Sequence, residues 1–269
     1  MDRYAVIGNP VAHSKSPQIH AEFARQTGEP LTYSTLLAPL NDFRRAVASF
    51  IQSGGKGLNV TIPFKLEAFE FAHRLSKRAQ AAGAVNTLSF NAGETAGDNT
   101  DGAGLVRDIT HNLCFSMQGR NVLLLGAGGA ARGVILPLFA EGPSMITIAN
   151  RTVTRAEELV AHFSDQGRIE AVDFNALQDR QFDLIINATA ASLGNDSLPI
   201  PLSVFTKDVL AYDMMYGKAD MPFLNLARQA GAQTADGLGM LVEQAAESFY
   251  IWRGIRPDTT PVLKQLRVG

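Results

Sequence analysis

The sequence predicts an α/β fold, and three of its features support that prediction. Short β-branched apolar runs alternate with longer amphipathic runs, which is typical of βαβ units with a mostly parallel sheet. A glycine-rich turn directly follows a run that is apolar throughout, 121–125. The polar segment 98–101 interrupts the alternation before a second βαβ series begins at Asn121, so we expect a domain boundary near residue 101.

The expected elements follow from hydrophobic periodicity. The expected strands are 4–7, 32–37, 57–60, 85–90, 121–125, 145–149, 169–172, 184–187 and 209–212. The expected helices include 16–27, 40–52, 130–141, 154–163 and 222–230. The run 85–90 enters Asn91-Ala-Gly93 and returns through 95–97, so we expect an antiparallel hairpin there.

Composition and charge favour a small-molecule partner. The chain has 24 basic and 26 acidic residues with no long run of one sign, so it offers no electrostatic footprint for nucleic acid or for an anionic membrane. It has no apolar run of about 18 residues and no apolar leader after Met1, so we expect a cytoplasmic protein. The single cysteine, Cys114, cannot form an internal disulfide, and we expect it to be a buried apolar residue.

The glycine-rich turn is a candidate dinucleotide site. The segment 126–131 has the pattern G-x-G-x-x-A. Gly126 would permit a tight turn, Gly128 would let a pyrophosphate approach the backbone, and Ala131 would keep the following helix close to the sheet. The free N–H groups at the start of that helix favour phosphate. Small residues at such a turn can also serve packing alone. The residues that follow the next strand therefore have to distinguish a dinucleotide site from a turn that only packs.

The residues after the next strand indicate NADP rather than NAD. An NAD site usually has an acid there for the ribose hydroxyls, but this chain has Asn150-Arg151-Thr152, followed by Arg155 one turn later. A guanidinium can bind the 2′-phosphate of NADP in a forked, charge-assisted pair, whereas an acid would repel it. We therefore predict NADP(H) as the cofactor; the alternative is that both arginines are solvated residues at a helix start.

Polar residues also follow strands in the first hundred residues, where a doubly wound sheet binds its ligands. After the first strand, Ser14 and Ser16 precede a helix, with Ser16 expected as the N-cap and Pro17 as its first residue. Two hydroxyl groups beside a helix N-terminus suit a carboxylate.

The second polar segment contains the strongest candidate for chemistry. Strand alternation places Asn59 and Thr61 on the same side, and Pro63 is expected to start a helix with Lys65 in its first turn. A lysine is unfavourable beside the positive end of a helix dipole, so its presence there suggests a functional role at this position.

Asn86 and Asp101 complete the set of polar candidates in this part of the chain. Each of these residues taken alone suits a cap or a loop, but together they form an excess of hydroxyl-binding groups at one edge.

At these positions the chain resembles the shikimate dehydrogenases. The matching segments run in order over nearly the whole chain: Gly8-Asn-Pro, Ser14-Lys-Ser16-Pro17, Asn59-Val-Thr61-Ile-Pro63 with Lys65, Gly83-Ala-Val-Asn86-Thr87, Asn99-Thr-Asp101-Gly102, Gly126-Ala-Gly-Gly-Ala130, Asn150-Arg151-Thr152, Tyr212-Asp213-Met214 with Tyr216, and Asp236-Gly237-Leu-Gly239-Met-Leu with Gln244. This set of spaced motifs is far more specific than the glycine turn alone.

The resemblance implies a domain arrangement and a reaction. Residues 1–101 and 238–269 would form a substrate-binding catalytic domain that C-terminal helices complete, and residues 102–237 would form an inserted Rossmann-type NADP-binding domain. The implied activity is the NADPH-dependent, reversible reduction of 3-dehydroshikimate to shikimate in aromatic amino acid (chorismate) biosynthesis, by a monomer or a homodimer.

The resemblance also implies residue roles. In similar enzymes the residues matching Ser14, Ser16 and Tyr216 hold the substrate carboxylate, those matching Thr61, Asn86, Asp101 and Gln244 hold ring oxygens, and Asn59 lies nearby. The implied cofactor-binding residues are Gly126, Ala127, Gly128, Gly129, Ala130, Asn150, Arg151, Thr152, Arg155, Thr189, Met214 and Gly237. The chain departs from the family pattern at Lys77, where we expect an acid, and at 190–191, where many relatives have a serine.

The expected chemistry centres on Lys65 and Asp101. Hydride transfer to a carbonyl carbon leaves negative charge on the oxygen, so a proton donor or cation is needed within hydrogen-bond reach. We predict that Lys65 supplies it and that Asp101 orients Lys65 and the adjacent hydroxyl. We expect domain closure to exclude water.

Three alternatives stay open or are disfavoured by the sequence. A quinate/shikimate dehydrogenase paralogue with broader substrate or NAD use differs little in sequence, although Arg151 and Arg155 argue against NAD. A non-catalytic, ligand-sensing relative would be expected to lose Lys65 or Asp101, and this chain has both. A metal site has little support, because the five histidines are scattered and are expected to be surface or capping residues.

Overall fold

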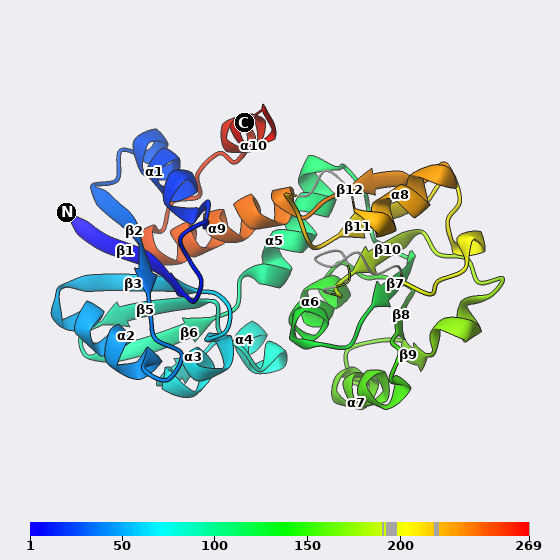
Figure 1. Ribbon diagram of the computed structural model, residues 1–269, viewed down its shortest axis with the longest axis horizontal. Coiled ribbons are helices and arrows are strands. Elements are labelled where there is room, and N and C mark those ends of the chain that lie inside the picture. Colours follow the sequence, from blue (N-terminus) through cyan, green and yellow to red (C-terminus); the bar gives the residue numbers. More distant parts are fainter. Residues whose placement is uncertain (190, 192–197, 218–220, 269) are drawn as a thin grey trace. The chain divides into compact units, whose positions relative to one another are not determined.

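The chain forms two compact units in a computed structural model that describes residues 1–189, 191, 198–217 and 221–268. The first unit contains residues 1–104 and 241–269, and the second contains residues 105–240. The chain leaves the first unit within helix α5 (Asp101–Arg107) and returns to it within helix α9 (Leu238–Arg253) (Figure 1). Each unit has one six-stranded sheet with helices against it, so the predicted α/β class is confirmed.

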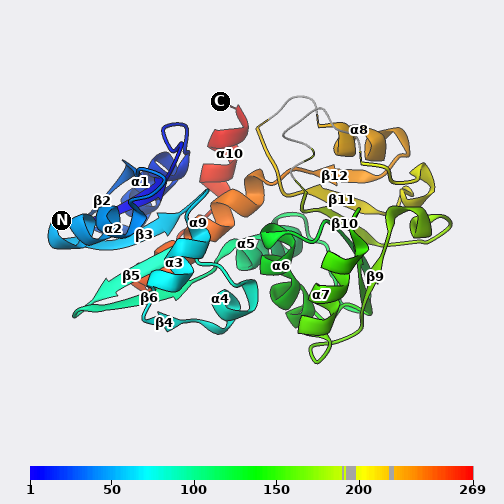
Figure 2. The same cartoon turned by 60° about the horizontal axis from the view of Figure 1, so that its bottom comes forward.

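The sheet of the first unit combines parallel and antiparallel pairs. Its order is β2-β1-β3-β5-β6-β4, with β1 parallel to β2 and β3, and with β5 antiparallel to β3 and β6. The predicted hairpin is the pair β5 and β6, which Figure 2 shows lying side by side. The strand bounds are β1 Asp2–Gly8, β2 Leu31–Leu37, β3 Gly55–Val60, β4 Arg74–Leu75, β5 Thr87–Asn91 and β6 Glu94–Asp98.

Helices cover both faces of this sheet, as strand alternation requires. Tyr4 of β1 joins a core with α1 and α9, whereas its neighbour Ala5 joins a second core with α2 and α3. Figure 1 shows the same division, with α1 and α9 on one side of the sheet and α2 and α3 on the other. The remaining helix bounds are α1 Ser16–Thr27, α2 Phe43–Gln52, α3 Lys65–Phe71, α4 Lys77–Ala82 and α10 Thr260–Val268.

The sheet of the second unit is parallel throughout. Its order, β12-β11-β10-β7-β8-β9, is that of a doubly wound nucleotide-binding fold, and the strand order reverses between β7 and β10. Its apolar runs are buried on both faces, which explains their continuous hydrophobicity. The strand bounds are β7 Asn121–Leu125, β8 Met145–Ala149, β9 Ile169–Val172, β10 Leu184–Asn187, β11 Leu210–Asp213 and β12 Gln233–Ala235.

The helices and turns of the second unit lie before or between these strands in sequence. They are α6 Gly129–Ala140, α7 Val153–Phe163 and α8 Pro222–Gln229, with a π-helical turn η1 at Asp108–Asn112 and 3-10 turns η2 at Phe174–Leu177 and η4 at Leu202–Val204. In the described part of the chain, no helix is both long and apolar enough to cross a membrane.

The buried carboxylate of Asp108 connects η1 to two other segments of the second unit. It accepts a hydrogen bond from the Tyr212 hydroxyl at 2.7 Å, and that hydroxyl also accepts the Met240 N–H. A Cβ atom at Gly239 would lie 2.0 Å from Asp108 Oδ1, so only glycine fits there.

The expected bounds of α1 are confirmed, but its predicted N-cap and the predicted starts of α2 and α3 were wrong. Lys15, not Ser16, is the N-cap of α1, and Ser16 is its first residue. Helix α2 begins at Phe43 because Asp42 is still in a turn whose N–H bonds to Pro39 O. Pro63 lies before the N-cap Phe64, so α3 begins at Lys65.

Two burial predictions were also wrong. Cys114 is exposed, because it lies in a connection after η1 with φ of +53° rather than on a packed face. His20 is fully buried in the core between α1 and α9, stacked on Tyr33 with ring centroids 4.1 Å apart. Burial lowers the pKa of its imidazole to about 3, and the neighbouring Asn59 side chain opposes this shift only in part.

Candidate active site

Lys65 and Asp101 form a close ion pair in the first unit. Lys65 is the first residue of α3, Asp101 is the first residue of α5, and Lys65 Nζ lies 2.6 Å from Asp101 Oδ2. The side chains are 33% and 23% exposed, so the pair is sheltered but still open to a ligand. The other carboxylate oxygen, Oδ1, accepts a hydrogen bond of 2.8 Å from Asn86 Nδ2. Asp101 therefore accepts hydrogen bonds from two sides.

Backbone hydrogen bonds explain why these distant residues meet. The Val85 N–H donates to Lys65 O, the Val60 N–H donates to Asn86 O, and the Asn86 N–H donates to Asp98 O. The segments after β3 and before β5 and α5 are thus tied together at one edge of the sheet. The predicted meeting of positions 65 and 101 follows from this arrangement.

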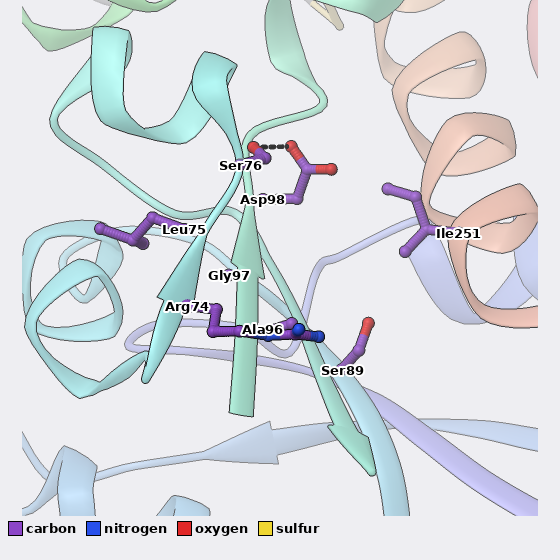
Figure 3. A pocket seen from close by; sticks show the side chains of 8 residues that line it. All are labelled: Arg74, Leu75, Ser76, Ser89, Ala96, Gly97, Asp98 and Ile251. Atoms are coloured by element: carbon purple, nitrogen blue, oxygen red, sulfur yellow. Dashed lines mark hydrogen bonds between the residues drawn. The ribbon is translucent and has the colours of Figure 1, made fainter. Parts of the chain in front are cut away.

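A surface hollow lies beside the loop that carries Asp101 but contains none of the predicted site residues. Its volume is about 350 Å³, and it is lined by Arg74, Leu75, Ser76, Ser89, Ala96, Gly97, Asp98 and Ile251 (Figure 3). Asp98 is fixed there by the Ser76 hydroxyl at 2.6 Å, as the dashed line in Figure 3 marks, and by the Arg78 guanidinium. These bonds fix the start of the loop three residues before Asp101.

The two predicted carboxylate-binding serines lie together at the start of α1. Ser14 Oγ accepts the Ser16 N–H at 3.2 Å, and Ser16 is buried. Thr61 is beside the end of β1, because a Cβ atom at Gly8 would lie 2.4 Å from Thr61 Cγ2. The segments after β1 and β3 can approach this closely only because residue 8 is glycine.

Gln244 reaches the same cluster from α9. Its Oε1 atom lies 3.4 Å from Thr100 Oγ1 and 3.5 Å from Asn86 Nδ2, and its Nε2 donates to Leu241 O at 2.8 Å. The structure therefore brings Gln244 to Asn86 and Thr100.

Asn59 and Asn86 are buried, and their side-chain amides are occupied by protein partners. Asn59 Oδ1 accepts the Tyr33 hydroxyl at 2.7 Å, and its Nδ2 donates to Ser248 Oγ at 2.9 Å. Asn86 Oδ1 accepts the Thr100 N–H at 2.8 Å. Thr87, Thr100 and Ser248 belong to this cluster, and sequence reasoning missed them; their hydroxyls gave no signal beyond their presence in or near the recognised motifs.

In the second unit, the glycine turn has the shape that a pyrophosphate needs. Gly126 has φ of +102°, and a Cβ atom there would lie 2.9 Å from Thr189 Cγ2. A Cβ atom at Gly128 or Gly129 would meet nothing within 4 Å, so the backbone before α6 is open to a ligand. The turn follows β7, next to the strand-order reversal, where such folds bind dinucleotides.

The two predicted phosphate-binding arginines are exposed at the end of β8. Arg151 precedes the N-cap Thr152 of α7, and Arg155 lies in the first turn of that helix. Asn150 Nδ2 donates to Thr152 O at 2.8 Å, which shapes the connection. Exposed guanidinium groups in place of an acid fit the 2′-phosphate of NADP.

Buried polar residues position the residues that directly follow β10 and β11. Asn187 Nδ2 donates to Asp213 Oδ2 at 2.9 Å, while Asn187 Oδ1 accepts from both the N–H and the hydroxyl of Thr189. Asn187 O also accepts the Met214 N–H. Sequence reasoning named Thr189 and Met214 but missed the Asn187–Asp213 pair that positions them.

Met214 and Gly237 also meet. A Cβ atom at Gly237 would lie 2.3 Å from Met214 O, and the Gly237 N–H donates to Met215 O at 3.0 Å. Tyr216 lies in the same loop as Met214, and burial raises the pKa of its hydroxyl. Lys77 is an exposed first residue of α4, and Ala190 lies outside the described residues.

A parallel doubly wound sheet with an open glycine turn and exposed arginines, in one chain with a sheltered lysine–carboxylate pair, defines an NADP-dependent oxidoreductase that acts on a CH–OH group. Comparison with known proteins makes the class more specific. Three family models match: the shikimate dehydrogenase substrate binding domain at residues 6–88, shikimate / quinate 5-dehydrogenase at 108–194, and the shikimate 5'-dehydrogenase C-terminal domain at 237–267. The chain belongs to the shikimate dehydrogenase family.

The similarity to individual relatives extends over nearly the whole chain. The chain is 61% identical to a shikimate dehydrogenase (NADP(+)) of Janthinobacterium sp. (strain Marseille), over 99% of this chain and 97% of that protein. It is similar to the structure of an Ael1 enzyme from Pseudomonas putida, with a TM-score of 0.96, 50% identity, and coverage of 99% and 98%. It is also similar to shikimate 5-dehydrogenase from Thermus thermophilus in complex with NADP(H) and shikimate, with a TM-score of 0.88, 32% identity and 99% coverage of both chains.

Proposed function

We propose that this protein catalyses the NADPH-dependent, reversible reduction of 3-dehydroshikimate to shikimate, a step of aromatic amino acid (chorismate) biosynthesis. The observation that supports this proposal best is the 2.6 Å pair of Lys65 Nζ and Asp101 Oδ2, with the second Asp101 oxygen held by Asn86. NADPH supplies the hydride. The residues of this chain bind and orient the substrate and manage the proton at its oxygen.

Lys65 is the group that handles the proton. Its ammonium donates a hydrogen bond to the ketone oxygen, and either delivers the proton or stabilises the negative charge that grows there. In the reverse direction the same nitrogen accepts the proton of the hydroxyl. Asp101 holds the ammonium in place and accepts a hydrogen bond from the adjacent ring hydroxyl, for which a carboxylate oxygen retains free lone pairs.

Substrate contacts are proposed for the residues that match the family motifs. Ser14, Ser16 and Tyr216 bind the carboxylate, while Thr61 and Gln244 bind ring oxygens. For Asn59 and Asn86, a direct substrate contact stays a prediction, because the amide groups of both already have protein partners.

The cofactor residues are proposed on the same basis. The backbone of 126–130 binds the pyrophosphate, and Asn150, Arg151, Thr152 and Arg155 bind the 2′-phosphate and its ribose. Thr189, Met214 and Gly237 border the nicotinamide. A cytoplasmic location and a monomeric or homodimeric state belong to this proposal too.

The test is a spectrophotometric assay of NADPH formation from shikimate and NADP, with the Lys65→Met variant alongside the wild type. Lys56→Met is a matched control, since Lys56 is an exposed lysine of β3 in the same unit. The proposal expects activity in the wild type and in Lys56→Met, and almost none in Lys65→Met. Absence of NADPH formation by the folded wild type would refute the proposal.

A second substrate, quinate, is suggested by one specific observation. The family model that matches 108–194 describes both shikimate and quinate 5-dehydrogenases. Turnover on quinate, measured with NADP and with NAD under the same conditions, decides this second candidate.

A further inference from the structure

Behind the Lys65–Asp101 pair lies a chain of buried hydrogen bonds that runs in one direction. We propose that Thr87 is a positioning residue in this chain of hydrogen bonds. Its hydroxyl accepts a hydrogen bond from Asn59 and donates one to Asn86, and it thereby fixes the orientation in which Asn86 binds Asp101. The role in catalysis rests on the proposed function, and the bonds themselves can be tested without it. We use the name buried relay for Tyr33, Asn59, Thr87, Asn86 and Asp101.

Backbone groups fix the orientation of both amides in the buried relay. The Asn86 oxygen accepts the Thr100 backbone N–H at 2.8 Å, so its NH₂ group must face the other way. The Asn59 NH₂ group donates to the backbone oxygen of Asn86 at 3.3 Å, so its Oδ1 must face Tyr33. Neither amide can be turned over without setting like groups against each other.

With both amides fixed, each side chain of the relay donates a hydrogen bond to the next one. Tyr33 donates to Asn59 Oδ1 at 2.7 Å. The two hydrogens of Asn59 Nδ2 are shared among Ser248 Oγ at 2.9 Å, Thr87 Oγ1 at 3.2 Å and Asn86 O at 3.3 Å. The Thr87 hydroxyl donates its one hydrogen to Asn86 Oδ1 at 2.8 Å. Asn86 Nδ2 donates to Asp101 Oδ1 at 2.8 Å, which leaves Oδ2 to face the Lys65 ammonium.

Burial makes the loss of one of these hydrogen bonds costly in free energy. Thr87 is 0% exposed and Asn86 is 2% exposed, so water does not readily replace a lost partner. A valine at position 87 keeps the shape of threonine but leaves one polar group of Asn59 and one of Asn86 with a partner fewer. Asn86 then holds Asp101 less firmly, and the ammonium that depends on Asp101 is placed less accurately.

Ser248 lies beside the relay and contacts two of its residues. Its oxygen lies 2.9 Å from Asn59 Nδ2, 2.8 Å from Thr87 Oγ1 and 3.0 Å from Gln244 O. Since Thr87 gives its one hydrogen to Asn86 Oδ1, the single hydrogen of Ser248 is shared between Thr87 Oγ1 and Gln244 O. No hydrogen bond between Ser248 and Asn86 is present among the described residues. Ser248 therefore acts on Asn86 through Thr87, whereas Thr87 and Thr100 contact Asn86 Oδ1 directly.

The test compares Thr87→Val with Thr87→Ser in the full-length protein. We expect kcat for shikimate oxidation to fall about tenfold to a hundredfold in Thr87→Val, with KM for shikimate and for NADP within about threefold of the wild type. Thr87→Ser keeps the hydroxyl and should restore most of kcat. Should Thr87→Val be insoluble, Thr87→Ala removes the same hydroxyl without adding a methyl group.

A control separates positioning from stability. Thr95→Val makes the same substitution at a buried threonine of β6 whose hydroxyl is not part of the relay. This variant should keep kcat within about threefold of the wild type even where thermal unfolding shifts. Equal losses of kcat in Thr87→Val and Thr95→Val, or no rescue by Thr87→Ser, would overturn the proposal.

A measurement without substrate separates this inference from the proposed function. In the substrate-free protein, NMR of the Asn86 side-chain NH₂ group should show slow hydrogen exchange in the wild type and in Thr87→Ser, and faster exchange in Thr87→Val. Unchanged exchange in Thr87→Val overturns the relay, whereas a wild type that is inactive on shikimate refutes only the proposed function.

Discussion

Lowering the pH should destabilise the first unit through His20, by an amount that can be worked out from the structure. His20 is fully buried among aromatic rings, and burial lowers its pKa to about 3. In the unfolded chain its pKa returns to 6.5. Below pH 6.5 the unfolded state therefore binds a proton that the folded state does not, so stability is present above that pH and is lost as the pH falls toward 3.

The magnitude follows from the two pKa values. Between pH 7 and pH 5, proton uptake by the unfolded state alone lowers the free energy of unfolding by about 2 kcal/mol. This is a substantial part of the total stability of an ordinary domain, about 5–15 kcal/mol.

The variant that isolates this effect is His20→Phe. Phenylalanine keeps an aromatic ring beside Tyr33 and does not titrate. Its extra volume changes stability by a similar amount at every pH, so that change cancels in the comparison.

The assay is urea unfolding at pH 7 and pH 5, followed by tryptophan fluorescence. Trp252 is the single tryptophan of the chain, it belongs to the first unit, and its ring centroid lies 5.5 Å from that of His20. The wild type should lose about 2 kcal/mol more than His20→Phe between the two pH values. If both proteins lose the same amount, His20 is not held neutral by burial and the reasoning fails.

Three further predictions concern the two predicted binding sites. Lys65→Met should lower kcat by about a hundredfold to ten-thousandfold with little change in KM for shikimate, as steady-state kinetics at saturating NADP will measure; a kcat like that of Lys56→Met would contradict this. Arg151→Ala should weaken NADPH binding about tenfold to a hundredfold without affecting NADH, measured by thermal-shift titration, whereas the exposed Arg168→Ala should change neither; an unchanged preference for NADPH would remove the role of Arg151. Gly126→Ala should destabilise the protein by about 1–3 kcal/mol and weaken NADPH binding, because an L side chain is strained at φ of +102° and its Cβ would lie 2.9 Å from Thr189; calorimetry that finds wild-type stability would argue against this reading of the turn.

The division into domains at 101–102 and 237–238 stays a prediction about folding units. The structure places the change of unit inside α5 and α9 rather than in a linker. Expression of residues 105–240 alone, with circular dichroism and NADPH titration, would show whether the second unit folds by itself.

The sequence determined the features that depend on neighbouring residues. Apolar runs and amphipathic periods are local, so they predicted the longer strands and the hairpin of β5 and β6, but not the short elements β4, α4 and β12. The glycine turn and the arginines after β8 were also readable, because they follow strands at fixed spacing. The motif around Lys65 and Asp101 was readable by resemblance, and backbone pairing of their segments brought the two side chains together.

Only the tertiary structure decided which side chains lose their contact with water and which partners they receive. His20 was expected at the surface but lies in a core that α9 completes, more than two hundred residues later in the chain. Asn59 receives Ser248 as a partner across 189 positions, and no local pattern encodes such a pair. Burial and hydrogen-bond saturation are properties of distant segments packed together, and for that reason the relay behind Asp101 could be found only in the folded chain.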